Sequence, residues 1–309
     1  MSKLSDLVTE LGEKALELED GFSLFERLKN NDIDNNETLR TLEELSIISV
    51  EFSDLLIEAG VILPLPEHFI HSKNYHSYLA LALVDHDLRD FSSGYAMEVA
   101  TLILYQKKER DFKSEFSNEE LFIYYENLRV GLNTIGLIAT GDEKFVSEIS
   151  RDKFAGMLQN ITDDNDFSCD LNGVETICTD VYFDVIQMIK NAKKSLYHAK
   201  DLFPDNVDTN IRVSFKEHNP NLTVSVRDNA TGIPQEILPK IFGNYTSRDG
   251  TAVGLQVVKR IADLRDGYIE VVSTTQGNET YKYDTRSGKV EKYDKQEPRG
   301  TTFKLYIPK

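Results

Sequence analysis

A helix face in the C-terminal half carries polar residues whose types suit a phosphate or cation site. Gln187, Asn191 and Lys194 recur at the i, i+4 and i+7 positions of one face of the helix expected over about 180–200. An asparagine amide can ligate Mg²⁺, and a lysine amine can contact phosphate oxygens. A solvated helix face would show the same residue types, so this face alone leaves both interpretations open.

Two further segments carry residues suited to a nucleotide. Asp228 follows the alternating strand 222–227 and precedes a turn with Gly232, so its carboxylate stands at a strand end. There it could accept the exocyclic amine of an adenine, or simply form an Asx turn. Gly250 and Gly254 mark a glycine-rich loop that opens the next helix, whose first N–H groups could bind phosphate or serve as an ordinary helix start.

The elements that must position these residues change character along the chain. Apolar residues at three- and four-residue steps predict helices up to about residue 150, and the pattern becomes mixed after about 160. The expected helices lie at about 2–19, 36–59, 74–108, 117–138, 180–200 and 253–265. The expected strands lie at 211–216, 222–227, 268–273 and 302–307, with an exposed hairpin at 279–296 that turns at Ser287-Gly288. These elements predict a helical N-terminal region joined to an α+β domain.

Composition narrows the class of protein. The 309 residues carry a net charge of −17, and the pI is near 4.8, which argues against nucleic acid or an anionic membrane as the main partner. Cys169 and Cys178 are too few for a disulfide framework, and the first residues lack the apolar stretch of a secretion signal. The longest apolar run, 78–84, is too short to cross a bilayer, so we expect a cytoplasmic protein with no membrane partner.

His86 is the histidine best placed for chemistry. On the helix expected over 74–108, apolar residues follow a four–three seam, and His86 falls on the opposite, solvent-facing side. A neutral imidazole there is nucleophilic and could accept a phosphoryl group, although most surface histidines have no such role.

In order and spacing, the C-terminal segments resemble the boxes of the GHKL ATPases, specifically the catalytic domain of histidine kinases. The matching segments are Gln187-Met-Ile-Lys-Asn191-Ala-Lys-Lys194, Asp228-Asn-Ala-Thr-Gly232-Ile233, Ile241-Phe242-Gly-Asn-Tyr245-Thr-Ser-Arg248, Gly250-Thr-Ala-Val-Gly254-Leu255 and Gly300-Thr-Thr-Phe303. The sequence Asp85-His86-Asp87-Leu88-Arg89 resembles the family's phosphoacceptor box, about 105 residues before Asn191. The resemblance covers about 150 C-terminal residues and this box.

The resemblance implies roles for eight residues and two cofactors, ATP and Mg²⁺. His86 would take the phosphoryl group while Asp87 orients the imidazole and accepts its proton; the nucleotide residues are Asn191 (the Mg²⁺ ligand), Lys194 (phosphate), Asp228 (adenine amine), Gly232 (base pocket), and Gly250 and Gly254 (phosphates). Hydrolytic members of the family have a glutamate where this chain has Gln187, which cannot accept a proton, so direct ATP hydrolysis is disfavoured. Ala230 and Ala252 replace two customary glycines, and a methyl group is tolerated there only where φ is negative.

The leading interpretation is a cytosolic histidine kinase of a two-component system that autophosphorylates His86 and passes the phosphoryl group to an aspartate of a response-regulator receiver domain. The expected organisation is a helical input or interaction region at 1–65, a dimerising histidine-phosphotransfer hairpin at 66–150 and a GHKL α/β sandwich at 151–309. The hairpin would make the protein a homodimer. One alternative is a histidine phosphotransfer protein whose kinase-like domain binds no ATP, and another is a GHKL serine kinase such as an anti-sigma factor.

Overall fold

The chain divides into two units, residues 1–145 and 146–309. The computed structural model describes residues 40, 47, 130, 134, 137, 146, 148–161, 167–171, 173–202, 210–218, 221–243, 253–275, 279–295 and 297–308. Of the first unit it therefore describes single helical residues only: Arg40, Ile47 and the buried Val130, Thr134 and Leu137. The phosphotransfer hairpin around His86 and Asp87 lies outside the described residues and stays a prediction.

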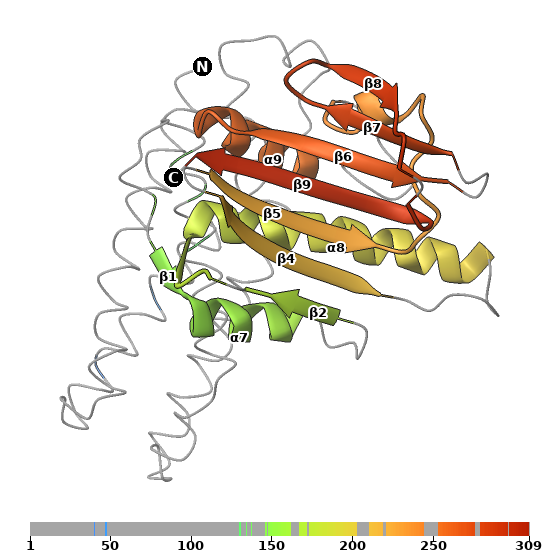
Figure 1. Ribbon diagram of the computed structural model, residues 1–309. Helices are drawn as coiled ribbons and strands as arrows, with labels where there is room; N and C mark the ends of the chain where they lie inside the picture. The colour runs from blue at the N-terminus through green and yellow to red at the C-terminus, as the bar shows by residue number, and fades with distance from the viewer. Residues whose placement is uncertain are drawn as a thin grey trace. The chain divides into compact units, whose positions relative to one another are not determined.

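The C-terminal unit is a seven-stranded sheet with its helices on one face (Figure 1). The strands are β2 (Phe167–Asp170), β4 (Ile211–His218), β5 (Asn221–Asp228), β6 (Tyr268–Thr274), β7 (Thr280–Asp284), β8 (Lys289–Lys292) and β9 (Gly300–Pro308). They lie in the order β2-β4-β5-β9-β6-β7-β8, parallel between β2 and β4 and antiparallel elsewhere. A separate antiparallel pair joins β1 (Glu148–Ser150) to β3 (Thr176–Cys178).

The helices are α7 (Arg151–Ile161), α8 (Thr179–Leu202) and α9 (Val253–Leu264), with a short 3₁₀ turn η4 (Leu238–Lys240). They cover the face onto which every second residue of the central strands points, because side chains alternate across a strand. The buried apolar residues of that face include Ile211, Val213, Phe215, Leu222, Val224, Val226, Ile269, Val271, Phe303, Leu305 and Ile307. From α8 they meet a stripe at helical spacing, formed by Val185, Met188, Ile189, Ala192 and Leu196.

At one end of this apolar face the side chains become polar. Asp228 stands opposite Ile211 in the β4–β5 register, and Thr301 stands opposite Ser273 between β9 and β6. Asp228, Ser273 and Thr301 are all buried, at 3%, 0% and 4% exposure. Burying polar groups is costly unless they are bonded to one another or to a ligand, so this polar row is the natural place to look for a site.

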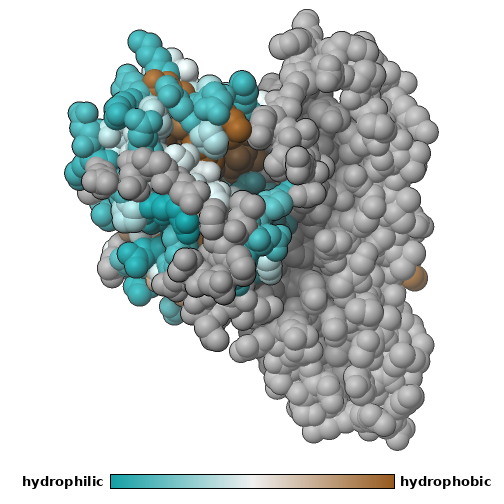
Figure 2. Space-filling view, turned by 90° about the vertical axis from the view of Figure 1, so that its right-hand side faces the viewer, coloured by the Kyte–Doolittle hydropathy of each residue, from teal (hydrophilic) through white to brown (hydrophobic). Residues whose placement is uncertain are grey.

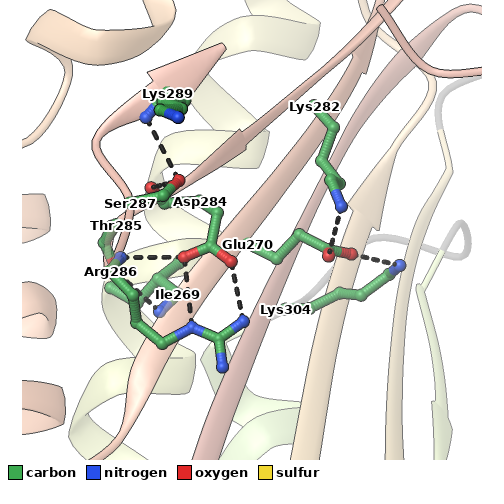
Figure 3. A network of polar contacts seen from close by, with 9 residues as sticks. All are labelled: Ile269, Glu270, Lys282, Asp284, Thr285, Arg286, Ser287, Lys289 and Lys304. Atoms are coloured by element: carbon green, nitrogen blue, oxygen red, sulfur yellow. Dashed lines mark hydrogen bonds and ion pairs between the residues drawn. The ribbon is translucent and has the colours of Figure 1, made fainter. Parts of the chain in front are cut away.

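The opposite face of the sheet is held by charged pairs between strands (Figure 3). The Glu270 carboxylate of β6 accepts a 2.8 Å bond from Lys304 of β9, and Lys282 of β7 lies 3.6 Å away. Arg286, in the turn between β7 and β8, pairs with Asp284 at 2.7 Å and lies 3.4 Å above the Tyr268 ring. The charged hairpin is therefore continuous with the sheet. Where Figure 2 shows described residues, the surface is mostly hydrophilic.

The predicted helices and single strands of the second unit are confirmed from α8 onward, with ends that differ by one or two residues. The predicted hairpin is present as β7 and β8, but the expectation that it is exposed is wrong for Thr280 and Tyr283, which are buried at 3% and 7% exposure. The periodicity missed β1, β2 and β3, which are only three or four residues long, and it did not separate α7 from the mixed region. Among the described residues no helix combines the length and hydrophobicity needed to cross a bilayer.

Candidate nucleotide-binding site

Asp228 is the most unusual polar group of the site. Its Oδ1 accepts hydrogen bonds from the backbone N–H groups of Ala230, at 2.9 Å, and Thr301, at 3.2 Å. Its Oδ2 makes no hydrogen bond within the described part of the chain. Burial raises the pKa of this carboxyl to about 6, although the two N–H bonds and Arg227 act in the opposite direction. One oxygen is thus fixed by the backbone, and the other is left to accept a donor from a ligand.

The turn after Asp228 is formed by residues that allow a close approach of two backbones. Gly232 has φ +75°, and a Cβ there would lie 2.3 Å from the carbonyl oxygen of Thr274 at the end of β6. The next N–H, of Ile233, donates a 2.6 Å bond to Ser273 Oγ. Ala230 is buried and is not among the described residues with positive φ, so the methyl group that replaces the family's glycine is accommodated without strain.

Asn191 and Lys194 lie on α8, which packs against the same face of the sheet as Asp228. Asn191 Nδ2 donates a 2.8 Å bond to the backbone carbonyl of Gln187, so its Oδ1 is turned away from its own helix. Lys194 is half-buried and makes no ion pair within the described residues. In Figure 1 the C-terminal end of β5 lies over the second half of α8, where these two residues are.

Gly254 has a packing role that the sequence did not indicate. A Cβ at this position would lie 2.5 Å from Oε1 of Gln187, which is itself buried at 3% exposure. The glycine therefore lets the first turn of α9 approach α8 directly. Gln187 fills the contact between the two helices and offers no proton acceptor at the position of the hydrolytic glutamate.

The structure thus places five of the eight predicted site residues: Asn191 and Lys194 on α8, Asp228 and Gly232 at the end of β5, and Gly254 against α8. His86, Asp87 and Gly250 lie outside the described residues. Sequence reasoning missed the roles of Thr301 and Ser273, which hold Asp228 and the Gly232 turn. The role of Thr301 could have been predicted, because Thr301 follows Gly300 in the closing box identified in the sequence. Ser273 has no such signal, because its pattern is that of any strand residue.

The donor set fits one mode of Mg²⁺ binding. The described residues contain no cluster of three or more histidine, cysteine or acidic side chains that could cage a metal ion. Mg²⁺ usually takes one or two protein oxygens and completes its shell with water and substrate phosphates. The amide oxygen of Asn191 is a ligand of this type, and its assignment to Mg²⁺ stays a prediction.

One turn before Gln187, α8 buries a second carboxyl, that of Asp184. Asp184 is 0% exposed, and neither of its oxygens has a hydrogen-bond partner among the described residues. Burial, and secondarily the charge of Asp180, raise the pKa of Asp184 well above its ordinary value of 3.8. Arg265 lies 3.8 Å from the carboxylate of the neighbouring Asp180. This carboxyl therefore costs stability whenever it ionises.

We expect Asp184→Asn to stabilise the protein at pH 8 by roughly 1–2 kcal/mol, since it removes an ionisable group with no partner. Because the pKa of Asp184 is raised in the folded state, the wild type keeps its full stability below the unfolded-state pKa and loses it as the pH rises through the folded-state pKa. The stability gain of Asp184→Asn should therefore vanish near pH 4. Urea unfolding at both pH values measures it. The exposed acid Asp263 supplies the control Asp263→Asn, and lower stability of Asp184→Asn at pH 8 would contradict the prediction.

Comparison with known proteins finds relatives of the C-terminal unit. Residues 184–309 match the family model of the histidine kinase-, DNA gyrase B- and HSP90-like ATPases. A probable C4-dicarboxylate sensor kinase of Halalkalibacterium halodurans is 28% identical over 169 residues, which are 53% of this chain and 26% of that protein. The nitrogen regulation protein NtrY of Azorhizobium caulinodans is 32% identical over 97 residues, or 30% of this chain and 13% of that protein.

Among solved structures, the nucleotide-free catalytic domain of the histidine kinase ThkA aligns with a TM-score of 0.38 and 17% identity, over 53% of this chain and 97% of that domain. The chain spans about a quarter or less of the curated relatives it matches. Residues 184–309 belong to the GHKL family of ATPase domains, and the chain is a relative of the sensor histidine kinases.

Proposed function

We propose that the C-terminal unit binds ATP with Mg²⁺ and that the chain is a histidine kinase of a two-component system. The observation that carries the proposal is Asp228, a buried carboxylate with one oxygen fixed by two backbone N–H groups and the other without a bond among the described residues. Such a group costs stability in the empty protein, and an adenine amine would supply the missing donor. Gly232 beside it brings the backbone close to the base.

The phosphate end of the nucleotide would lie along α8 and the first turn of α9. Lys194 would contact phosphate oxygens, and Gly250 and Gly254 would lie beside the phosphates. Bound Mg²⁺, held by Asn191 Oδ1, would neutralise charge on the phosphates during transfer. Because Gln187 is buried against Gly254 and cannot accept a proton, the site supports transfer to a protein nucleophile over hydrolysis.

The nucleophile in this proposal is His86, with Asp87 accepting its proton and orienting the ring. A phosphorylated histidine would then donate to an aspartate of a response-regulator receiver domain, which is the partner class we propose. Residues 66–150 would form the hairpin that presents His86 and dimerises, and residues 1–65 would receive the input. We also propose a cytoplasmic location, where ATP is available and where Cys169 and Cys178, both free thiols, stay reduced.

Incubation of the full chain with γ-labelled ATP and Mg²⁺ tests the proposal. We expect an acid-labile, base-stable label that falls at least about a hundredfold in His86→Ala and in Asn191→Ala, since one removes the acceptor and the other the Mg²⁺ ligand. His198→Ala is the matched control, because His198 is an exposed histidine of α8, and it should keep the label.

Two outcomes would contradict the proposal in different ways. A label that persists in His86→Ala would show that another residue accepts the phosphoryl group. No label, together with no nucleotide binding by calorimetry, would remove the kinase activity and favour the alternative of a phosphotransfer protein, which would accept a phosphoryl group on His86 from a phosphorylated receiver domain instead.

A further inference from the structure

The hairpin formed by β7 and β8, at the edge of the sheet, packs against the segment that follows η4. β6 and β9 are paired in the sheet, and the hairpin is inserted between them in the chain. In the sheet the hairpin lies on the other side of β6 and extends the sheet there. Tyr283 of β7 stands opposite Val271 in register and shares its face of the sheet, the helix-covered one. It is 7% exposed, and its ring stacks on Phe242 with 6.1 Å between centroids and 24° between planes.

Phe242 and the following Gly243 make a corner just after η4, which we call the Phe242-Gly243 corner. Phe242 is 8% exposed, and Gly243 N donates a 2.9 Å bond to the carbonyl of Lys240. The Gly243 carbonyl accepts a 2.8 Å bond from Nε2 of Gln256, in the first turn of α9. The corner is therefore held on one side by a ring from the added hairpin and on the other by an amide from α9.

Gln256, the residue of α9 that holds the corner, lies on the same helical turn as a residue of the proposed phosphate site. Gln256 follows Gly254 by two residues, and Gly254 packs on Gln187 of α8. The Gln187 carbonyl in turn accepts the bond that orients Asn191. The adenine half depends on other contacts, since Asp228 is fixed by Ala230 and Thr301.

We propose that Tyr283 and Gln256 are positioning residues that hold the Phe242-Gly243 corner and the first turn of α9 in register, and so set the affinity for the phosphate part of the nucleotide. The proposal rests on the nucleotide-binding function argued above. It gives the added hairpin a role in the site, although none of its residues need touch the ligand. A stacked ring and a single amide hydrogen bond are each worth enough to change an affinity severalfold.

Calorimetric titration of the full chain with ATP plus Mg²⁺, and separately with adenosine, tests the proposal. Gln256→Leu and Tyr283→Leu should each weaken ATP binding about fivefold to tenfold and leave adenosine binding unchanged within about twofold. Tyr283→Phe keeps the ring and should restore ATP binding. Lys259→Ala is the control on α9, because it removes an exposed ion pair with Asp263 and should change neither affinity.

The double variant Gln256→Leu/Tyr283→Leu adds a second readout. Because both residues hold the same corner, the loss of ATP affinity in the double variant should be smaller than the product of the two single losses. Equal losses for ATP and adenosine, or unchanged ATP binding in both single variants, would overturn the proposal while nucleotide binding by the wild type still stands. A wild-type chain that binds neither ligand would overturn the proposed function itself, and the proposal with it.

Discussion

Asp228→Asn is expected to make the nucleotide-free protein more stable at pH 8 and to abolish binding of adenine nucleotides. The asparagine Oδ1 can still accept the N–H bonds of Ala230 and Thr301, so the turn keeps its shape. The change removes a buried charge whose pKa is raised to about 6 by burial. From the ordinary aspartate pKa of 3.8, that shift corresponds to a gain on the order of 2–3 kcal/mol when the charge is removed. The asparagine amide would instead face the adenine amine with a donor, which cannot pair with it.

The pH dependence of this gain has a definite sign. A carboxyl with a raised folded-state pKa contributes full stability below its unfolded value of 3.8 and loses it as the pH rises through about 6. The advantage of Asp228→Asn should therefore be absent near pH 4, appear between pH 4 and 6, and be complete at pH 8. Nucleotide binding by the wild type should weaken below pH 6, because a protonated Asp228 no longer offers two acceptor oxygens.

Thermal unfolding with and without ATP measures both effects in one experiment. At pH 8 without ligand, Asp228→Asn should unfold several degrees above the wild type, since about 1 kcal/mol shifts the midpoint by roughly 2–4 °C in a domain of this size. Saturating ATP should raise the midpoint of the wild type and leave that of the variant unchanged. A variant that is less stable at pH 8, or one that ATP still stabilises, would show that Asp228 does not pair with the base.

A carboxylate that destabilises the empty protein is evidence for a ligand only when geometry leaves it a free acceptor. Asp184 and Asp228 are both buried acids with raised pKa values. Asp228 stands at a strand end, beside a glycine turn, with one oxygen oriented by two N–H groups. Asp184 lies within α8, and neither of its oxygens is bonded in the part of the chain that the structure describes. Asp228 is therefore oriented to bind a ligand, whereas Asp184 only lowers the stability of the folded protein when it ionises.

Much of the C-terminal unit follows from local sequence patterns. Alternation through Leu222, Val224 and Val226 placed their side chains on one face and Asp228 at the strand end, because the side-chain period of a strand is two. The apolar stripe of α8 likewise placed Asn191 and Lys194 on its polar side. Patterns of this kind need only neighbouring residues, and the structure confirms them.

The contacts that complete the site join residues far apart in the chain, and no local pattern specifies them. Thr301 bonds Asp228 across 73 positions, and Ser273 holds Ile233 across 40. The same holds for Tyr283 on Phe242. Whether the turn accepts the methyl group of Ala230 depends on the sign of φ at that residue, and the surrounding turn determines that sign. β2 needs its parallel partner β4 to exist at all, since four residues carry little periodicity of their own.

Alanine at the four described glycines with positive φ should separate backbone strain from close packing, with the larger losses at Gly232 and Gly300. All four positive-φ glycines disfavour a side chain, but only these two would place a Cβ against backbone. The Cβ would lie 2.3 Å from Thr274 O at Gly232, and 2.1 Å from Asp228 O at Gly300. At Gly173 and Gly288, with φ +81° and +64°, no atom of the described residues lies within 4 Å of that position.

Gly173→Ala and Gly288→Ala should therefore lose only the conformational term, about 1–2 kcal/mol, whereas Gly232→Ala and Gly300→Ala should each lose more than about 3 kcal/mol. Gly156→Ala, at an open position inside α7, should gain roughly 0.5–1 kcal/mol. Urea midpoints of the five variants give the ranking. Because Gly300 packs on the backbone of Asp228, its variant should also lose ATP binding in whatever fraction remains folded, while Gly288→Ala keeps it. Equal losses at all four positive-φ sites would mean that strain alone, and not the approach of β9 to the Asp228 turn, requires the glycines.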